Sequence, residues 1–478
     1  MKYEKSYLYY VVWYAYILNP MEPHLRITPE WPVKGSLSWQ LLKYNQPVRL
    51  RRHVKINGPM RILHLLSQQP GKTGSGVYLQ ALVQQGARDG LQQKIIVGIP
   101  SDSAKPEMTS LDTSCITCVR FCDPDLPYPV AGMSDVMPYQ STKFSDFTPE
   151  MLDAYLYAFA SILKKNVRDF RPHVIHTHHL WLATALTRLL FTDIPLVTTC
   201  HGTEMRQLDL APVFREFVIP ACSYVDRVMA LHENHMVRIH ELYGIDLSCI
   251  KLIGAGFRND IFCPPLSMTC SRSQKDTLTI VYAGKLSFAK GLPWLIESAE
   301  HLEHPSGKHI RLRIVGSGAG DEAELIREKA FRFRDIVEFL GQKPQEDLAS
   351  IFQDADVFVL PSLYEGLPLV VLEAIACGCR VVVTNLPGIN HWLPERLTNE
   401  GIVELVPMPQ LMGPDVPDPS SLPPFVHNLV TAINRQLYRC TAQEPNWENE
   451  VIPCIESMNW QGIYSKIRTV YQEVLSSE

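Results

Sequence analysis

Residues 357–374 read VFVLPSLYEGLPLVVLEA, which is the pattern of a short apolar strand, a loop and the start of a helix. The loop carries Glu365, and the helix is expected to begin near Leu367, so that Glu373 lies within it. Gly366 allows the backbone to pass close to a ligand, and the N–H groups at a helix N-terminus favour a phosphate. Taken alone, two glutamates beside a helix start are usually a solvated surface feature.

The same alternation of strand and helix runs through most of the chain. In the second half of the chain, strands are expected at 278–283, 311–315, 337–340, 357–360 and 380–384. In the first half the expected strands are 61–66, 94–97, 173–176, 196–200, 227–231 and 250–253, with a Pro- and Asp-rich excursion at about 100–149. Such alternation predicts α/β domains in which a parallel sheet has helices on both faces.

The length of 478 residues suits two domains of roughly 200 residues each. We expect two Rossmann-like, doubly wound domains at 60–262 and 276–455, joined by a Pro-containing linker and facing each other across a cleft. Residues 456–478 are expected to form a terminal helix, a candidate for docking back on the first domain. Because open sheets of this kind bind ligands at the carboxyl ends of their strands, the chemistry is expected in that cleft.

Composition narrows the function classes. Apolar residues make up 46% and charged residues 20% of the chain, as in a soluble enzyme, and the net charge of −5 argues against a nucleic-acid binder. Residues 1–59 form an extension whose apolar run at 7–18 is too short to span a bilayer. This extension is either loosely packed or, aided by the basic stretch at 49–53, a membrane-surface contact. We therefore expect a cytoplasmic protein, with a peripheral position on the inner membrane face as the alternative.

The twelve cysteines are scattered along the chain, which favours reduced cytosolic thiols. Cys115, Cys118 and Cys122 form a C-x2-C-x3-C cluster, but no fourth soft ligand stands at a diagnostic spacing. We expect ordinary thiols in a strand there and no metal.

Several loops that follow expected strands have side chains suited to a phosphate. Lys285 and Lys290 lie in the segment after the first strand of the second half, where two ammonium groups can face a diphosphate. Gly284 opens this segment, and Gly316 and Gly341 end the next two strands. Loops of this kind after successive strands are hard to explain by chance.

The glycine-rich segment GKTGSG at 71–76 in the first half has three interpretations. It is not a Walker A loop, because that motif needs glycine where Leu66 stands, and its spacing is irregular for a dinucleotide fingerprint. The third interpretation is a turn at a helix N-terminus, in which Gly74 and Gly76 let an anion or a sugar approach closely. A simple tight turn is the plainer alternative.

Together these motifs resemble glycosyltransferase family 4, the retaining nucleotide-sugar transferases of the GT-B fold, from about Met60 to the C-terminus. The most specific element is Glu365-x7-Glu373. The resemblance implies that Glu365 contacts the transferred sugar, that Glu373 binds the nucleotide ribose, and that Lys285 and Lys290 grip the diphosphate. The family more often has arginine at the first of these cations, and lysine lacks its bidentate fork.

In the first half, the segment CHGTE at 200–204 resembles the family's strand-end histidine, which implies that His201 lies near the reacting anomeric carbon. The neighbouring strand end, HTHH at 176–179, could imitate a metal site, but we expect only one of its histidines to face any given direction. We interpret this segment as cleft lining. His178, as the first candidate, and Glu204 are both expected as weak acceptor contacts.

The resemblance implies a retaining hexosyltransferase that needs no metal or cofactor and that acts on a nucleotide-diphosphate sugar and a hydroxyl acceptor. The expected catalytic residues are His201 and Glu365. The expected donor-binding residues are Gly74, Gly76, Gly284, Lys285, Lys290, Gly316, Gly366, Leu367 and Glu373. The alternatives are another GT-B sugar enzyme, such as a nucleotide-sugar epimerase or a phosphorylase, and a catalytically idle protein that binds nucleotide sugars.

Overall fold

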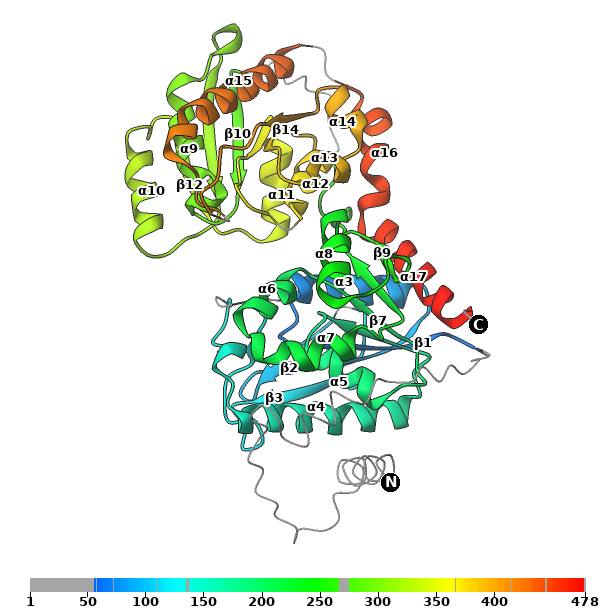
Figure 1. Cartoon of the computed structure of the whole chain (residues 1–478). Coiled ribbons are helices and arrows are strands. Elements are labelled where there is room, and N and C mark those ends of the chain that lie inside the picture. The colour runs from blue at the N-terminus through cyan, green and yellow to red at the C-terminus, as the bar shows by residue number, and fades with distance from the viewer. Residues whose placement is uncertain are drawn as a thin grey trace, which may run out of the picture. The chain divides into compact units, whose positions relative to one another are not determined.

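The computed structural model describes residue 56 and residues 58–476, apart from residues 72, 109, 135–136, 266–274, 366, 414 and 443–444. The chain forms two compact units, shown in Figure 1: Met1–Ile253 with Tyr464–Glu478, and Gly254–Ile463. The first unit ends before the expected boundary at 262, because Phe257 and Phe262 pack in the core of the second unit. The expected extension at 1–59 lies almost entirely outside the described residues.

The first unit contains a seven-stranded parallel sheet of order β3-β2-β1-β6-β7-β8-β9. Its strands are β1 (Arg61–Leu66), β2 (Gln92–Pro100), β3 (Ile116–Phe121), β6 (Val174–His178), β7 (Leu196–Thr199), β8 (Arg227–Ala230) and β9 (Ile250–Leu252). The main helices are α3 (Gly74–Arg88), α4 (Pro149–Phe170), α5 (Leu182–Leu190), α6 (Thr203–Leu210), α7 (Arg215–Cys222) and α8 (Glu233–Tyr243). Strand β3 lies inside the segment that the sequence predicted as an excursion, at the cysteine cluster for which a strand was expected.

The second unit contains a six-stranded parallel sheet of order β12-β11-β10-β13-β14-β15. Its strands are β10 (Thr277–Ala283), β11 (His309–Val315), β12 (Val337–Gly341), β13 (Val357–Leu360), β14 (Arg380–Thr384) and β15 (Val403–Val406). Its helices include α9 (Leu292–Ser298), α10 (Asp321–Phe331), α11 (Gln345–Asp354), α12 (Leu369–Ala376), α13 (Ile389–Trp392), α14 (Glu395–Asn399), α15 (Leu422–Thr441) and α16 (Ile452–Ile455). All four residues of β13 are buried, which explains its unbroken apolar sequence, since a sheet covered on both faces needs no polar face.

The last helix, α17 (Trp460–Ser476), packs against the first unit over most of its length. The Tyr471 hydroxyl lies 2.7 Å from Nδ1 of His176 on β6, and the Tyr464 hydroxyl donates to Asp89 at 2.8 Å. Lys251 pairs with Glu473 at 3.1 Å. These contacts tie the end of the chain to the unit in which the chain begins.

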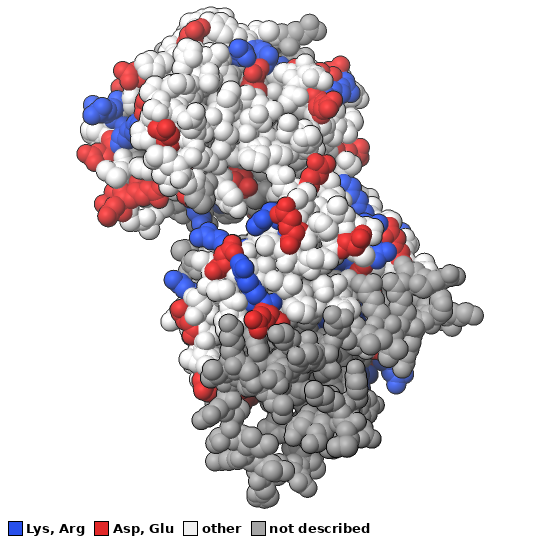
Figure 2. Space-filling model, in the orientation of Figure 1, with Lys and Arg blue, Asp and Glu red and all other residues white. Residues whose placement is uncertain are grey.

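The surface carries charges of both signs. Figure 2 shows lysine and arginine side chains interspersed with aspartate and glutamate over the visible face of each unit. Within the described residues, no helix is both long enough and apolar enough to cross a membrane.

Candidate functional site

The strand order of the second unit reverses between β10 and β13, which are neighbours in the sheet. In doubly wound sheets a ligand crevice forms at the carboxyl ends of the two strands where the order reverses. Lys290 follows β10 and Glu365 follows β13, and the structure brings their charged groups together, with Lys290 Nζ 2.7 Å from Glu365 Oε2. Their side chains are 24% and 16% exposed, so both remain reachable from solvent.

The Glu365 carboxylate is held at both of its oxygens. The Ser362 hydroxyl donates to Oε1 at 2.8 Å, while Oε2 faces Lys290. Lys290 also donates to the Tyr364 carbonyl at 3.3 Å. The sequence prediction missed Ser362, although its position three residues before Glu365 in the same loop was a usable signal.

Two glycines allow the loops at this edge to pack closely. Gly316, after β11, has φ +136°, and a Cβ there would lie 1.8 Å from the Gly284 carbonyl oxygen. Gly291 has φ +70°, and a Cβ there would lie 1.9 Å from the Pro361 carbonyl oxygen. Only glycine fits at these positions, and the result is that the loops after β10, β11 and β13 lie side by side.

Other expected donor residues lie around this pair with less definite roles. Lys285 is exposed and pairs with no carboxylate within the described residues, while its carbonyl accepts from the Tyr282 hydroxyl at 2.6 Å. Gly366 lies outside the described residues.

The helix after Glu365 begins later than the sequence predicted. Leu367 belongs to the loop, and α12 starts at Leu369, because a residue that precedes a proline, here Pro368, is disfavoured in the helical conformation. Glu373 lies in α12 as expected. Burial raises the pKa of Glu373 to about 7, so its carboxyl is half protonated near neutral pH.

In the first unit the glycine-rich segment forms a capped helix start. The Thr73 hydroxyl accepts from the Gly76 N–H at 3.1 Å at the start of α3, so this N–H is not open to an anion. A Cβ at Gly76 would lie 2.6 Å from the Gly71 nitrogen, whereas a Cβ at Gly74 would meet nothing within 4 Å. Gly76 is therefore explained by packing of the turn, and Gly74 leaves open space.

The strand order of the first sheet reverses between β1 and β6, and three histidines lie on these strands. His64 is paired in register with His176, and His178 lies two residues farther along β6. Residues two apart on a strand share a face, so the expectation that only one of these histidines faces a given direction was wrong. His178 is 1% exposed, which leaves no surface for the acceptor contact expected there.

His201 follows β7, and the residue as a whole is partly exposed. Its Nε2 lies 3.1 Å from His178 Nδ1, and the ring of Tyr78 on α3 meets it edge-on at 5.2 Å between centroids. Burial lowers the pKa of His201 to about 3, so the ring is neutral at pH 7. The sequence offered no signal for Tyr78, because this contact joins elements far apart in the chain.

Glu204 is fully buried and bonds to backbone groups. It accepts from the His201 N–H at 3.0 Å and from the Leu180 N–H at 3.2 Å. Burial alone would raise the pKa of this carboxyl, but nearby His179 and the hydrogen bonds hold the pKa below its ordinary value. The carboxylate fixes the backbone of His201, and the acceptor contact expected for Glu204 does not fit its burial.

Candidate metal ligands differ from the cysteines considered in the sequence. The cysteines of the expected cluster, Cys115, Cys118 and Cys122, are free thiols around β3. Within the described residues, the group close enough to hold an ion is His64, His176 and His178, which offer one nitrogen each within 4.8 Å of one another.

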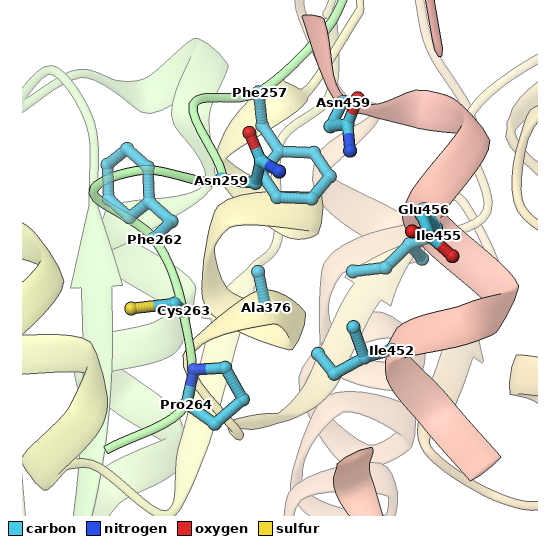
Figure 3. Close-up of a pocket in the computed structure, with 10 residues that line it drawn as sticks. All are labelled: Phe257, Asn259, Phe262, Cys263, Pro264, Ala376, Ile452, Ile455, Glu456 and Asn459. Carbon is cyan, nitrogen blue, oxygen red and sulfur yellow. The ribbon is translucent and has the colours of Figure 1, made fainter. Parts of the chain in front are cut away.

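The second unit also has a small pocket, shown in Figure 3. Its volume is about 170 Å³. Ile452 and Ile455 of α16 line one side of it, and Phe257 and Ala376 lie opposite. None of its lining residues is a residue expected to bind donor or acceptor.

Comparison with known families agrees with this geometry. The family described as "Glycosyltransferase Family 4" matches residues 73–260, and "Glycosyl transferases group 1" matches residues 269–398. The chain belongs to the group 1 glycosyltransferases of family 4. The two matched segments fall on the two sheets described above.

Individual relatives of this glycosyltransferase are moderately similar to it. Glycogen synthase of Mycobacterium tuberculosis (strain H37Rv) is 28% identical over 234 residues, which is 47% of this chain and 55% of the relative. D-inositol 3-phosphate glycosyltransferase of Corynebacterium aurimucosum is 28% identical over 271 residues, which is 52% of this chain and 64% of the relative. The chain thus spans 55–64% of the length of these relatives.

Solved structures with low sequence identity share the fold. Sucrose-phosphate synthase from Thermosynechococcus elongatus aligns with a TM-score of 0.61 and 17% identity over 88% of this chain and 100% of that one. Anabaena HepE in complex with UDP and glucose aligns with a TM-score of 0.56 and 16% identity over 87% of this chain and 100% of that one. The architecture of this chain is the GT-B fold.

Proposed function

We propose that this protein is a retaining glycosyltransferase that moves a hexose from a nucleotide-diphosphate sugar to a hydroxyl acceptor. The observation that carries this proposal is the Lys290–Glu365 pair at the carboxyl ends of β10 and β13. A cation and a carboxylate placed side by side match the two halves of a donor, its anionic diphosphate and the sugar that becomes cationic as the bond breaks. Family membership supports the same assignment.

The donor residues then have distinct roles. Lys290 and the exposed Lys285 neutralise the diphosphate, and Lys290 stabilises the charge that grows on the leaving oxygen. Glu365, held by Ser362, faces the positive charge that develops on the sugar ring. Glu373, on the helix that follows, accepts hydrogen bonds from the ribose hydroxyls.

Retention follows if the acceptor approaches from the face that the diphosphate leaves. The bond between the anomeric carbon and the phosphate oxygen breaks, and the acceptor oxygen forms the new bond to that carbon. The acceptor proton passes to the leaving phosphate oxygen, so the protein need not supply a base. We assign His201, neutral and partly exposed, to the reacting end of the donor.

We further propose that the reaction needs no metal ion, because the two ammonium groups supply the positive charge that Mg²⁺ supplies in other phosphoryl and glycosyl transfers. A chelator should leave turnover unchanged. Loss of turnover in chelator, restored by a divalent ion, would show that a metal takes part.

The donor is proposed to be a uridine diphosphate hexose, since solved structures of the same fold were determined with UDP-glucose and with UDP-2-fluoro glucose.

The free thiols of the described cysteines suit a reducing compartment, and we place the reaction in the cytoplasm.

The proposal is tested by a panel of UDP-, GDP- and ADP-sugars. A donor at 100 times its Kd should stabilise the protein by about 2.7 kcal/mol, which a thermal-shift assay detects, and incubation should release the nucleoside diphosphate. Formation of an epimeric nucleotide sugar, or turnover only with inorganic phosphate, would favour an epimerase or a phosphorylase. Binding without any turnover would favour an idle binding protein.

A further inference from the structure

A line of polar side chains lies behind His201 in the first unit. His201 Nε2 lies 3.1 Å from His178 Nδ1, and His64 Nε2 lies 3.1 Å from Gln93 Oε1. The centroids of the His64 and His178 rings are 6.5 Å apart. These four side chains come from β1, β2, the end of β6 and the loop after β7, and all but His201 are buried.

The direction of the hydrogen bonds is fixed at the Gln93 end. Gln93 Nε2 donates to the Val83 carbonyl at 2.9 Å, so Oε1 is the acceptor that faces His64. His64 Nε2 must therefore carry the hydrogen. Burial lowers the pKa of His64 to about 4, so the ring is neutral and its Nδ1 is a bare acceptor.

Two buried nitrogens remain between His64 and His178. His64 Nδ1 and His178 Nε2 have no hydrogen-bond partner among the described residues, and both side chains are 1% exposed. A buried polar atom without a partner is costly, and internal water usually supplies one. His64, His176 and His178 each offer one ring nitrogen within 4.8 Å of those of the other two, and two hydrogen bonds of about 2.8 Å through one water span a separation of that size.

The third histidine of the cluster makes a metal ion a poorer fit than water. His176 uses both nitrogens, with Nδ1 2.7 Å from the Tyr471 hydroxyl and Nε2 2.8 Å from the Thr199 hydroxyl. Its ring is also nearly parallel to that of His178, at 16° and 4.8 Å between centroids. Two parallel rings do not readily aim their lone pairs at one ion, and no buried carboxylate belongs to the group.

We propose that Gln93, His64 and one internal water form a relay that makes His178 the positioning residue for His201. The water accepts from His178 Nε2–H and donates to His64 Nδ1. His178 Nδ1 then accepts from His201 Nε2–H, and His201 Nδ1 keeps a lone pair that can accept from a substrate hydroxyl. The last role rests on the proposed glycosyl transfer, whereas the relay itself does not.

The tautomers are measured directly by NMR on the full chain with ¹⁵N-labelled histidine and without ligand. The His201 signals are assigned by their loss in His201→Gln. The relay predicts a single Nε2–H tautomer for His201, His178 and His64. A Nδ1–H tautomer at His201, or one bound divalent ion per chain by metal analysis, would overturn the relay.

Two variants break the relay at different points. His64→Phe removes the acceptor that faces His178, and Gln93→Met removes the group that orients His64 with less change to the fold. In either variant His201 should become a mixture of tautomers. Tyr471→Phe is the matched control, because it removes a buried hydrogen bond to His176 but leaves the relay intact, and His201 should keep its tautomer. An unchanged His201 in folded His64→Phe or Gln93→Met contradicts the proposal.

Kinetics separate positioning from packing. His178→Leu removes the acceptor for His201 and should lower kcat about tenfold or more, the effect of one lost hydrogen bond in the transition state. His178→Asn places an amide oxygen near the lost nitrogen and should recover most of kcat, while the donor KM stays constant in both. Equal loss in both variants would assign His178 to packing. If no nucleotide sugar is consumed while the tautomers behave as stated, the proposed function fails and the relay stands.

Discussion

Lys290 Nζ lies 2.7 Å from Glu365 Oε2, although the two residues follow different strands of the second sheet. Each side chain thus neutralises the other in the ligand-free protein. A donor that places its diphosphate on Lys290 and its sugar on Glu365 replaces this contact with one partner for each charge. In the proposed function, the pair marks the point at which the donor bond is broken.

Lys290→Met should weaken donor binding and lower kcat together, because it removes charge from the diphosphate and leaves Glu365 without its cation. Loss of one well-placed electrostatic group costs about a hundredfold in kcat. Lys329→Met is a matched control, since Lys329 on α10 pairs with Glu297 of α9, away from the site. Full donor saturation kinetics on both variants test this, and equal effects would mean that the Lys290 charge has no special role.

Glu365 and Glu373 should respond differently to replacement by glutamine. Contacts made only in the transition state raise kcat, whereas contacts made equally in the ground state mainly lower KM. Glu365→Gln should lower kcat about a hundredfold, and Glu373→Gln should chiefly raise the donor KM. Circular dichroism checks folding. Normal turnover in Glu365→Gln with weaker binding alone would falsify the assigned roles.

Donor affinity should depend on pH through Glu373. Burial raises the pKa of Glu373 to about 7, and the ionised carboxylate is the form that accepts from both ribose hydroxyls. The ionised fraction rises about tenfold from about pH 6 to about pH 8, so the donor Kd should fall by a similar factor. Calorimetric titration with donor across this pH range measures the Kd. In Glu373→Gln the Kd should not change with pH. Weaker binding at higher pH would contradict the ribose role.

Stability should fall on mild acidification because of His64. Burial lowers its pKa to about 4, against 6.5 for an unperturbed histidine. Between these values the unfolded chain binds a proton that the folded chain does not, so the free energy of unfolding falls with falling pH by about 1.4 kcal/mol per pH unit. The contribution of His64 to this free energy is constant above this window. Glu373 acts in the opposite sense, since its pKa is raised.

The His64 contribution is isolated by comparing wild type with His64→Phe. The free energy of unfolding, measured with denaturant from about pH 7 to about pH 4.5, should depend less steeply on pH in the variant. The difference between the two slopes should correspond to the uptake of about one proton. Identical slopes would mean that His64 is already protonated or exposed in the folded state.

Much of the donor edge could be predicted from sequence because it depends on local signals. The apolar run 357–360 is bounded by Asp356 and Pro361, and β13 has the expected bounds. Lys290 and Glu365 follow parallel strands, whose carboxyl ends share one edge. The predicted start of α12 was two residues early, because Leu367 precedes Pro368 and a residue before proline is disfavoured in a helix.

The environment of His201 could not be predicted, because it depends on contacts between distant parts of the chain. Tyr471 reaches His176 from the last helix, and His64 meets His178 only because β1 and β6 are neighbours in the sheet. The sequence also does not reveal that backbone N–H groups engage the Glu204 carboxylate. The one hint of these buried polar contacts in the sequence was the presence of polar residues in an otherwise apolar strand.

Transfer with retention at the Lys290–Glu365 edge can be decided by the anomeric configuration of the first product. The donor is a UDP-hexose with an α-linked sugar, and the acceptor is water or a hydroxyl compound. Proton NMR can identify the anomer of the product as it forms, before mutarotation mixes the anomers of any free sugar. The α-anomer should appear first in wild type, and Glu365→Gln should form it at about one hundredth of the rate. A β-configured first product would show inversion, and an equal rate in Glu365→Gln would remove Glu365 from the reaction.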